Sequence, residues 1–352
     1  MYEIPRITMT MLGATGSGKT TYLHGMYDTL STGVNGYFLY ATDPDKDLDL
    51  AEAWEELCEA GTLPDATATE PVDYEFVFRH GMTTLLEIDC QDFRGGAGTE
   101  RLGKPESPED IAKLRARLDI SDTIILALDG QHVARWVADN TPAGLSRAHD
   151  PMKIARFSKA ISTVCVKRLE AEEPTPAIVV LLTKADLLGK LSGKPIKEAL
   201  EAVKRNLFKL VQVLGSEGVT VMLCPVQIGA FDGANLSTVD PGQVNPKNLH
   251  KPITFALMHY LTEIIPRRQE LISSMDRGLD AQSSELAGLR GGFMDGIFHR
   301  GRISAVESSM ATDRSARGEL AAQVAEARKR AEQMADDLRT SPIYRSGKLQ
   351  EA

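Results

Sequence analysis

The stretch Ile7-Thr-Met-Thr-Met-Leu-Gly13-Ala-Thr-Gly-Ser-Gly-Lys19-Thr20 decides how this chain is expected to fold. Its first residues are apolar or β-branched and predict a strand, the glycines predict a loop, and the segment from Lys19 to about Leu30 has a helical pattern. Glycines let successive backbone N–H groups turn inward around a phosphate, and the following helix presents its positive end to the same anion. The spacing G-x-x-x-x-G-K-[ST] therefore predicts a phosphate-binding loop.

Two side chains of this loop have specific expected roles. Lys19 would reach the β- and γ-phosphates and is a catalytic candidate, and the hydroxyl of Thr20 is a hard oxygen ligand that suits Mg²⁺. The candidate nucleotide-binding residues of the loop are Gly13, Ala14, Thr15, Gly16, Ser17, Gly18, Lys19, Thr20 and Thr21.

A carboxylate for the metal is expected at the end of a neighbouring strand, in Leu85-Leu-Glu-Ile-Asp-Cys-Gln-Asp92-Phe-Arg-Gly95-Gly96. Asp92 and Gly95 have the D-x-x-G spacing in which the aspartate holds the magnesium shell through water and the glycine amide senses the γ-phosphate. Asp89 lacks a glycine at that spacing. Asp92 is therefore the favoured metal-side carboxylate, with Asp89 as the alternative, and Gly95 is a catalytic candidate.

The sequence Thr183-Lys-Ala-Asp186 directly follows the apolar run that ends at Leu182. An aspartate in the form [NT]-K-x-D can accept hydrogen bonds from guanine N1–H and the 2-amino group, whereas adenine offers neither donor on that edge. Lys184 would lay its methylene stem over the base. A backbone contact to the base is expected after the next strand. The base-site candidates are Thr183, Lys184, Asp186, Cys224, Pro225 and Val226.

Strands that alternate with helices predict an α/β fold, a mostly parallel sheet with helices on both faces. The runs Ile124 to Leu128 and Ala177 to Leu182 are apolar throughout, as expected of strands covered on both sides. Tyr74 to Cys90 predicts a β-hairpin that turns at His80-Gly81. We expect one nucleotide-binding domain over residues 1–266, with an insert at about 31–70.

After Pro266 the pattern becomes helical only. Leu271, Met275 and Leu279 suggest one apolar stripe, and glycines between 291 and 301 suggest a hairpin tip. A second stripe follows a coiled-coil-like spacing through Leu320, Val324, Ala327, Ala331, Met334 and Leu338. We therefore expect residues 267–352 to form an α-helical hairpin that either projects from the α/β domain or folds back onto it.

Composition excludes several classes of protein. The net charge of -9 argues against DNA or RNA as the main ligand, because nucleic-acid binding needs a basic surface. The apolar runs are far shorter than the roughly 20 residues of a membrane-spanning helix, and the N-terminus lacks a secretory signal. The four cysteines are far apart and are expected to be reduced. We expect a cytoplasmic protein.

The three motifs, in this order and spacing, resemble the translation-factor-related (TRAFAC) class of P-loop GTPases over about residues 5–265. More narrowly, Leu63-Pro-Asp-Ala-Thr67, Asp92-Phe-Arg-Gly-Gly96 and Asn245-Pro-Lys-Asn-Leu-His-Lys-Pro252 are similar to bacterial members of a double-GTPase type that carry a long insert before switch I. The resemblance implies a Ras-like sheet, a switch I threonine on magnesium and a GTP/GDP conformational cycle. Thr67 is our choice for that threonine, with Thr69 as the alternative.

Two positions depart from the family pattern. Thr183 replaces the commoner asparagine, which in the family ties the base loop to the phosphate loop, so a weaker nucleotide affinity is expected. Gly96 stands where many relatives carry a glutamine that orients the attacking water, so slow hydrolysis is expected. Gln91 or Arg94 could substitute, or a partner could supply the missing group. Arg94 could equally be a surface residue of the switch.

The leading hypothesis is an enzyme that hydrolyses GTP to GDP and phosphate with Mg²⁺ and cycles as a molecular switch. The alternative is a GTP-dependent adaptor that signals through its C-terminal helices without significant unaided hydrolysis. Both imply a protein partner at the switch regions and the C-terminal helices. Phe293, Met294, Ile297 and Phe298, beside cations, could bring the hairpin tip to a membrane, although we favour burial of the tip against protein.

Overall fold

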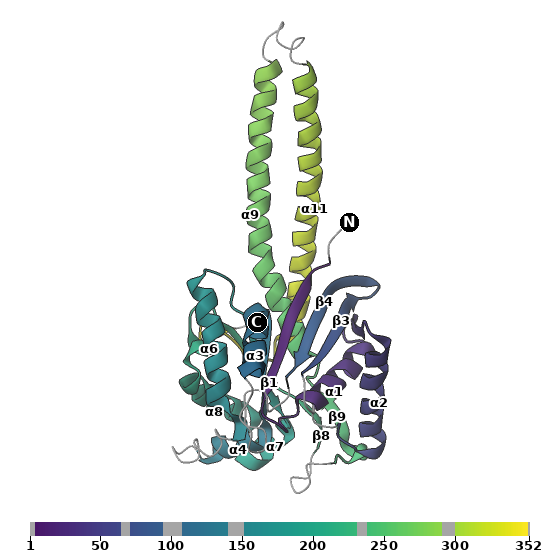
Figure 1. Cartoon of the computed structure of the whole chain (residues 1–352), viewed down its shortest axis with the longest axis vertical. Helices are drawn as coiled ribbons and strands as arrows, with labels where there is room; N and C mark the ends of the chain where they lie inside the picture. Colours follow the sequence, from purple (N-terminus) through teal and green to yellow (C-terminus); the bar gives the residue numbers. More distant parts are fainter. Residues whose placement is uncertain are drawn as a thin grey trace. The chain divides into compact units, whose positions relative to one another are not determined.

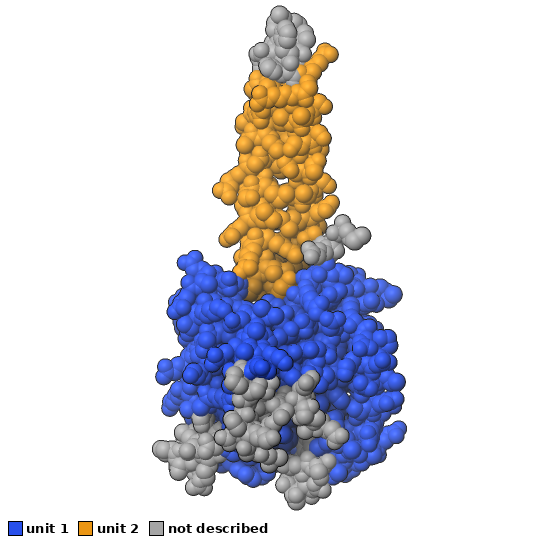
Figure 2. All heavy atoms as spheres, in the orientation of Figure 1, with its two compact units in different colours: residues 1–256, 338–352 blue, residues 257–337 orange. Residues whose placement is uncertain are grey.

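The computed structural model describes residues 4–64, 71–93, 108–139, 151–230, 238–290 and 300–350. The chain divides into two compact units, Met1–Ala256 with Leu338–Ala352, and Leu257–Asp337 (Figure 2). The strands are β1 (Arg6–Gly13), β2 (Tyr37–Ala41), β3 (Val72–His80), β4 (Thr83–Asp92), β5 (Thr123–Asp129), β6 (Ala177–Thr183), β7 (Thr220–Pro225), β8 (Gln227–Gly229), β9 (Val244–Lys247), β10 (Ile343–Arg345) and β11 (Lys348–Leu349). The helices are α1 (Lys19–Ser31), α2 (Pro44–Ala60), α3 (Pro108–Ile120), α4 (Gly130–Asp139), α6 (Ile154–Glu170), α7 (Ala185–Ser192), α8 (Ile196–Leu210), α9 (Lys251–Arg290) and α11 (Arg300–Leu338).

The first unit is built on a nine-stranded sheet in the order β11-β10-β7-β6-β5-β1-β4-β3-β2. Its neighbouring strands β1, β4 and β3 are labelled in Figure 1. The five central strands β7, β6, β5, β1 and β4 run parallel to one another. Antiparallel strands extend the sheet at both sides, with β3 and β2 beyond β4 and β10 and β11 beyond β7. The predicted fold class, an α/β fold with a mostly parallel sheet and helices on both faces, is confirmed.

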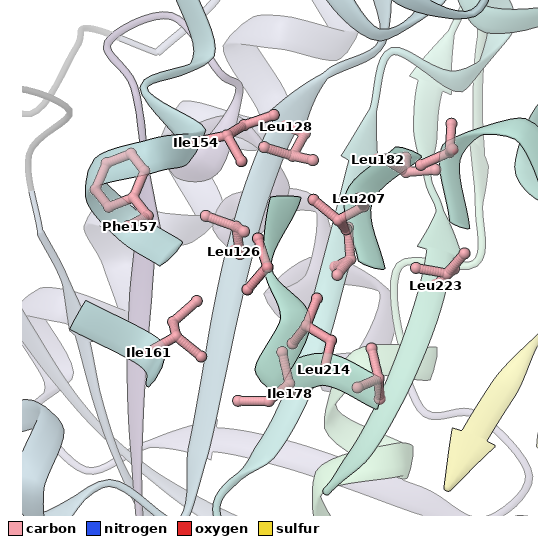
Figure 3. Packing of buried hydrophobic residues seen from close by; sticks show 14 of the residues in the cluster. Leu126, Leu128, Ile154, Phe157, Ile161, Ile178, Leu182, Leu207, Leu214 and Leu223 are labelled. Carbon is pink, nitrogen blue, oxygen red and sulfur yellow. The ribbon is translucent and has the colours of Figure 1, made fainter. Parts of the chain in front are cut away.

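The central strands are covered on both faces, as their apolar sequences predict. Every residue of β5 and β6 is buried. Alternate residues of β5, β6 and β7, among them Leu126, Ile178 and Leu223, pack in one core cluster with α6 and α8 residues such as Phe157 and Leu207 (Figure 3). Because both faces of β5 and β6 are covered, polar groups of these two strands can reach the surface only at the strand ends.

The strand register brings three loops to the same edge of the sheet. Gly13, the last residue of β1, is in register with Ala127 of β5. Asp129, the last residue of β5, is in register with Thr183, the last residue of β6. In open α/β sheets ligands bind outside the carboxyl ends of the strands, so the site is expected at this edge.

The predicted hairpin is present, and β2 and α2 lie within the region predicted as an insert, residues 31–70. β2 pairs with β3 at one side of the sheet, and α2 follows it after Asp43, whose side chain accepts a hydrogen bond from the backbone N–H of Asp45. β3 and β4 form the predicted antiparallel pair, and Gly81 in their turn has a φ of 54°.

The second unit contains two helical segments that lie antiparallel. Arg317 pairs with Asp276, and Arg302 nearer the start of α11 pairs with Glu285 nearer the end of α9. On α11 the predicted stripe is buried at Val324, Ala327 and Met334 and half-buried at Leu320 and Ala331. The predicted tip residues Phe293, Met294, Ile297 and Phe298 lie outside the described residues.

Three details differ from the prediction for residues 267–352. Pro266 lies inside α9, so one helix runs through the expected domain boundary. Proline removes one backbone hydrogen bond of a helix, yet α9 continues on both sides of Pro266. Leu271 is 52 % exposed, outside the stripe of Met275 and Leu279. The final segment is not helical: Tyr344 of β10 is buried and pairs with Val221 of β7.

Among the described residues, no helix combines the length and apolar character needed to cross a bilayer.

Candidate functional site

The loop between β1 and α1 requires glycine at two positions. Gly13 has a φ of 153°, and a Cβ there would lie 2.6 Å from the carbonyl oxygen of Ala127 and 2.7 Å from Ser17 Oγ. Gly18, the N-cap of α1, has a φ of 78° and leaves only 3.3 Å between an added Cβ and the Cβ of Thr183. The chain therefore turns sharply onto the N-terminus of α1, where helix geometry leaves backbone N–H groups for an anion.

Lys19, the first residue of α1, is a buried cation that contacts this loop. Lys19 is only 5 % exposed, and its Nζ donates hydrogen bonds to the carbonyl oxygens of Gly13 at 3.0 Å and Ala14 at 3.4 Å. Burial lowers the pKa of Lys19, and the nearby charge of Asp92 partly offsets that effect. A buried ammonium is stabilised by an anion, so this position favours a phosphate ligand.

Asp92 lies beside the loop, and Asp89 does not. The hydroxyl of Thr20 donates to Asp92 Oδ2 at 3.0 Å, and Asp92 is 1 % exposed. Asp89 instead forms a bidentate ion pair with Arg117 of α3, with distances of 2.6 and 2.9 Å. The hydrogen bonds from Arg117 hold the pKa of Asp89 below its usual value. The alternation of side chains along β4 separates these two carboxylates onto opposite faces of the sheet.

The oxygen ligands at Thr20 and Asp92 suit Mg²⁺. A hydroxyl and a carboxylate are the hard donors that this ion prefers, and it commonly keeps waters and phosphate oxygens for its other positions. In the described part of the chain, no group of three or more His, Cys, Asp or Glu residues could hold a metal ion alone.

The loop after β6 is tied to the phosphate loop by two side chains. Thr183 Oγ1 donates to the carbonyl oxygen of Ser17 at 2.8 Å. Lys184 Nζ donates to the carbonyl oxygen of Gly16 at 3.2 Å and forms an ion pair with Asp129 Oδ2 at 2.5 Å. The Thr183 hydroxyl therefore makes a contact between the two loops, as the asparagine does in the family, and the weaker nucleotide affinity expected from this replacement stays a prediction.

The loop after β7 joins the same assembly through its backbone. Ala185 N donates to the carbonyl oxygen of Val226 at 3.1 Å, and Val226 N donates to the carbonyl oxygen of Leu182 at 2.9 Å. Val226 therefore lies next to the base motif, at the place in the chain order where a base contact was predicted.

These loops enclose a cavity of about 380 Å³. A smaller pocket adjoins it and shares Gly18 and Lys184 with it. The predicted residues that line one or both are Thr15, Gly16, Ser17, Gly18, Lys19, Thr20, Thr21, Thr183, Lys184 and Val226. The phosphate motif and the base motif thus share one pocket.

Several lining residues were not predicted from the sequence: Tyr22, Leu63, Pro64, Asp129, Gln131, His132, Gln227, Ile228 and Leu249. Asp129 is the most informative of them because it forms the ion pair with Lys184. It directly follows the apolar run that ends at Leu128, so a polar residue at the carboxyl end of a buried strand was the available signal.

Other predicted residues are not brought to the pocket or lie outside the described part. Gln91 donates to Asp73 of β3 on the exposed side of the sheet, because it alternates with Asp92 along β4. Asp186 is half-buried in the first turn of α7, and neither it, Cys224 nor Pro225 lines the pocket. Thr67, Thr69, Arg94, Gly95 and Gly96 fall outside the described residues.

No family model and no curated protein matches the sequence. Among solved structures, one of sup35 complexed with GDP is 13 % identical with a TM-score of 0.29, covering 71 % of this chain and 44 % of that one. A structure of a mutational variant of SsGBP is 16 % identical with a TM-score of 0.26, covering 63 % of this chain and 49 % of that one. The chain therefore spans less than half of each protein, and similarity at this level does not identify a function.

Proposed function

We propose that this chain binds GTP with Mg²⁺, hydrolyses it to GDP and phosphate, and cycles as a molecular switch with slow unaided turnover. One observation carries the proposal. The Thr183 hydroxyl contacts the Ser17 carbonyl and the Lys184 ammonium contacts the Gly16 carbonyl, so a phosphate loop and a guanine-type motif are joined directly. A nucleotide is the common ligand that carries both a phosphate chain and a base at that separation.

The proposed roles follow from the chemistry of each side chain. Lys19 and the N-terminus of α1 would bind the β- and γ-phosphates, and Thr20 would hold Mg²⁺ directly while Asp92 holds it through water. Such an ion, when bound, supplies positive charge that neutralises the transferring phosphoryl group. Asp186 would accept hydrogen bonds from guanine. Adenine has no donor at that edge and would leave the carboxylate unpaired, so ATP would bind more weakly than GTP.

A second candidate is a GTP-dependent adaptor with negligible unaided hydrolysis, and the position of Gln91 favours it. Gln91 donates to Asp73 rather than facing the loop, and no other described residue was predicted to orient the attacking water. In this case a partner that contacts the segments around 65–70 and 94–107 or the C-terminal helices would supply the missing group.

Nucleotide titration of the purified protein tests the binding part of the proposal. Fluorescent GTP, GDP and ATP analogues are titrated with and without Mg²⁺, and tight binding of the two guanine nucleotides with at least 100-fold weaker ATP binding is expected. Equal affinity for ATP and GTP would contradict guanine specificity and would leave only general binding of phosphates.

Single-turnover hydrolysis separates the two candidates. Radiolabelled GTP is preloaded and phosphate release is followed with and without extract from the source cells. Slow but measurable release by the purified protein supports the switch, and release only in the presence of extract supports the adaptor. Rapid release by the purified protein would contradict both.

A further inference from the structure

A second cavity lies between α3 and α6, apart from the candidate nucleotide site, and has a volume of about 510 Å³. It shares no lining residue with the pocket at the phosphate loop. Its floor is apolar and comes from both helices: Leu114 and Leu118 on α3, and Phe157 and Val164 on α6. These four side chains belong to the main core cluster, so the floor is a fixed part of the fold.

The cavity is a groove that follows the two helices. On α6 its lining residues run from Arg156 to Lys167, which corresponds to roughly 17 Å at the rise of an α-helix. On α3 they run from Ile111 to Asp119, roughly 12 Å. A groove of two to three helical turns, bounded by two helices, has the shape that receives a third helix along its length.

The rim of the groove is positively charged. Arg115, Arg156, Lys159 and Lys167 line it, against one acidic residue, Asp119. Lys167 forms an ion pair with Asp119 at 2.6 Å, and cationic lining residues outnumber acidic ones. This patch contrasts with the net charge of -9 of the whole chain.

We propose that this groove, called here the α3–α6 groove, binds an acidic amphipathic helix of a partner protein. Apolar side chains of that helix, spaced i, i+3 or i+4, and i+7, contact the floor, and its flanking Asp and Glu side chains pair with the rim cations. Burial of the apolar stripe supplies affinity, while the charges fix its orientation and speed association. The groove rests on side chains that take no part in the proposed nucleotide site, so the two proposals stand or fall separately.

The test uses the full chain and a labelled designed peptide. The peptide has about 18 residues, with leucines on one helical stripe and glutamates beside it, and fluorescence anisotropy measures its binding. A control peptide of the same composition has the stripe scrambled. We expect saturable binding of the first peptide and at least 10-fold weaker binding of the second.

Two kinds of variant locate the binding in the groove. The pair Arg156→Glu and Lys159→Glu reverses the rim charge and is expected to weaken binding at least 10-fold. Lys113→Glu makes a single change of the same kind at an exposed position of α3 that does not line the groove, and it should bind as the parent does. Ala160→Trp, a half-buried position that lines the groove, should block binding without a change of charge. Thermal unfolding checks that each variant is folded.

Three outcomes would overturn the proposal. The first is equal binding of the striped and scrambled peptides, and the second is unchanged binding by both the charge-reversed and the Ala160→Trp proteins. The third concerns the class of ligand. If fluorescent dodecanoate binds saturably in the groove and the peptide does not, the groove takes a small amphiphilic anion and not a helix.

Discussion

The phosphate end and the base end of the candidate site are built in different ways. At the phosphate end, Lys19 contacts carbonyl groups of its own loop, at Gly13 and Ala14. At the base end, Thr183 contacts Ser17 and Lys184 contacts Asp129, so the contacts join loops that are far apart in the sequence. The phosphate end is therefore a local motif, whereas the base end is assembled by the sheet. Each prediction below perturbs one end and asks whether the other responds.

The largest effect is expected at the phosphate end from Lys19→Ala. This change removes a buried cation that would pair with the phosphates, and we expect a loss of about 1000-fold in affinity, or about 4 kcal/mol. Because Lys19 does not face the base, GTP, GDP and ATP should be affected alike in fluorescence titrations. Lys190→Ala, at an exposed position of α7, is the control. A loss confined to guanine nucleotides would contradict the separation of the two ends.

The next largest effect is expected at the base end from Asp186→Asn. The loss of the carboxylate should weaken GTP binding about 100-fold, or about 3 kcal/mol. Xanthosine triphosphate should bind better than to the parent, because the new amide can donate to the 2-carbonyl that replaces the guanine 2-amino group. Competition titrations measure both, with Glu198→Gln on the exposed side of α8 as the control. Unchanged discrimination among bases would remove Asp186 from the site.

A third prediction concerns how the stability of the fold depends on pH through His24 on α1. Burial lowers the pKa of His24 on α1 to about 4. In the unfolded chain His24 binds a proton near pH 6.5, whereas in the folded chain it stays neutral until about pH 4. The free energy of unfolding therefore falls as the pH falls from 6.5 towards 4. Between pH 6.5 and 5 this amounts to about 2 kcal/mol.

Urea unfolding of the parent and of His24→Gln at pH 7 and pH 5 measures this effect. The difference between the two proteins isolates the histidine from the other titrating groups, and the parent should lose more stability than the variant. Equal losses would mean that His24 is protonated in the folded state over this range.

The smallest effect is expected from Thr183→Val, which removes a hydrogen bond between the two ends of the site. Removal of one hydroxyl leaves the carbonyl of Ser17 with one contact fewer, at a cost of about 1 kcal/mol. We expect a fall of a few degrees in the unfolding temperature and about 5-fold weaker GTP binding. Thr183→Ser keeps the hydroxyl and should restore most of both. If valine behaves as the parent does and serine does not, the methyl group and not the hydroxyl matters.

The same contrast explains what could be predicted from the sequence. The phosphate loop is contiguous, so its glycines, Lys19 and Thr20 reveal it without knowledge of the fold. The parallel sheet followed from apolar runs such as Ala177 to Leu182, because strands covered on both faces lack alternation. Asp92 lies beside Thr20 as its position at a strand end implied.

Residues whose place depends on register were missed. Asp129 meets Lys184 only because β5 and β6 align it with Thr183, and no motif marks it. Gln91 was a candidate by proximity in sequence, but the alternation along β4 turns it towards Asp73. The strand at Ile343–Arg345 is too short to give a periodic signal, and its pairing with β7 supplies the missing information.

The pairing of β10 with β7 also constrains when the sheet can be completed. Tyr344, buried in the core, reaches Val221 only after the whole helical hairpin has been synthesised. During translation the edge of β7 must therefore stay uncovered while residues 226–342 emerge from the ribosome, an interval in which an exposed strand edge is open to wrong pairing. Chaperone protection would matter most during that interval.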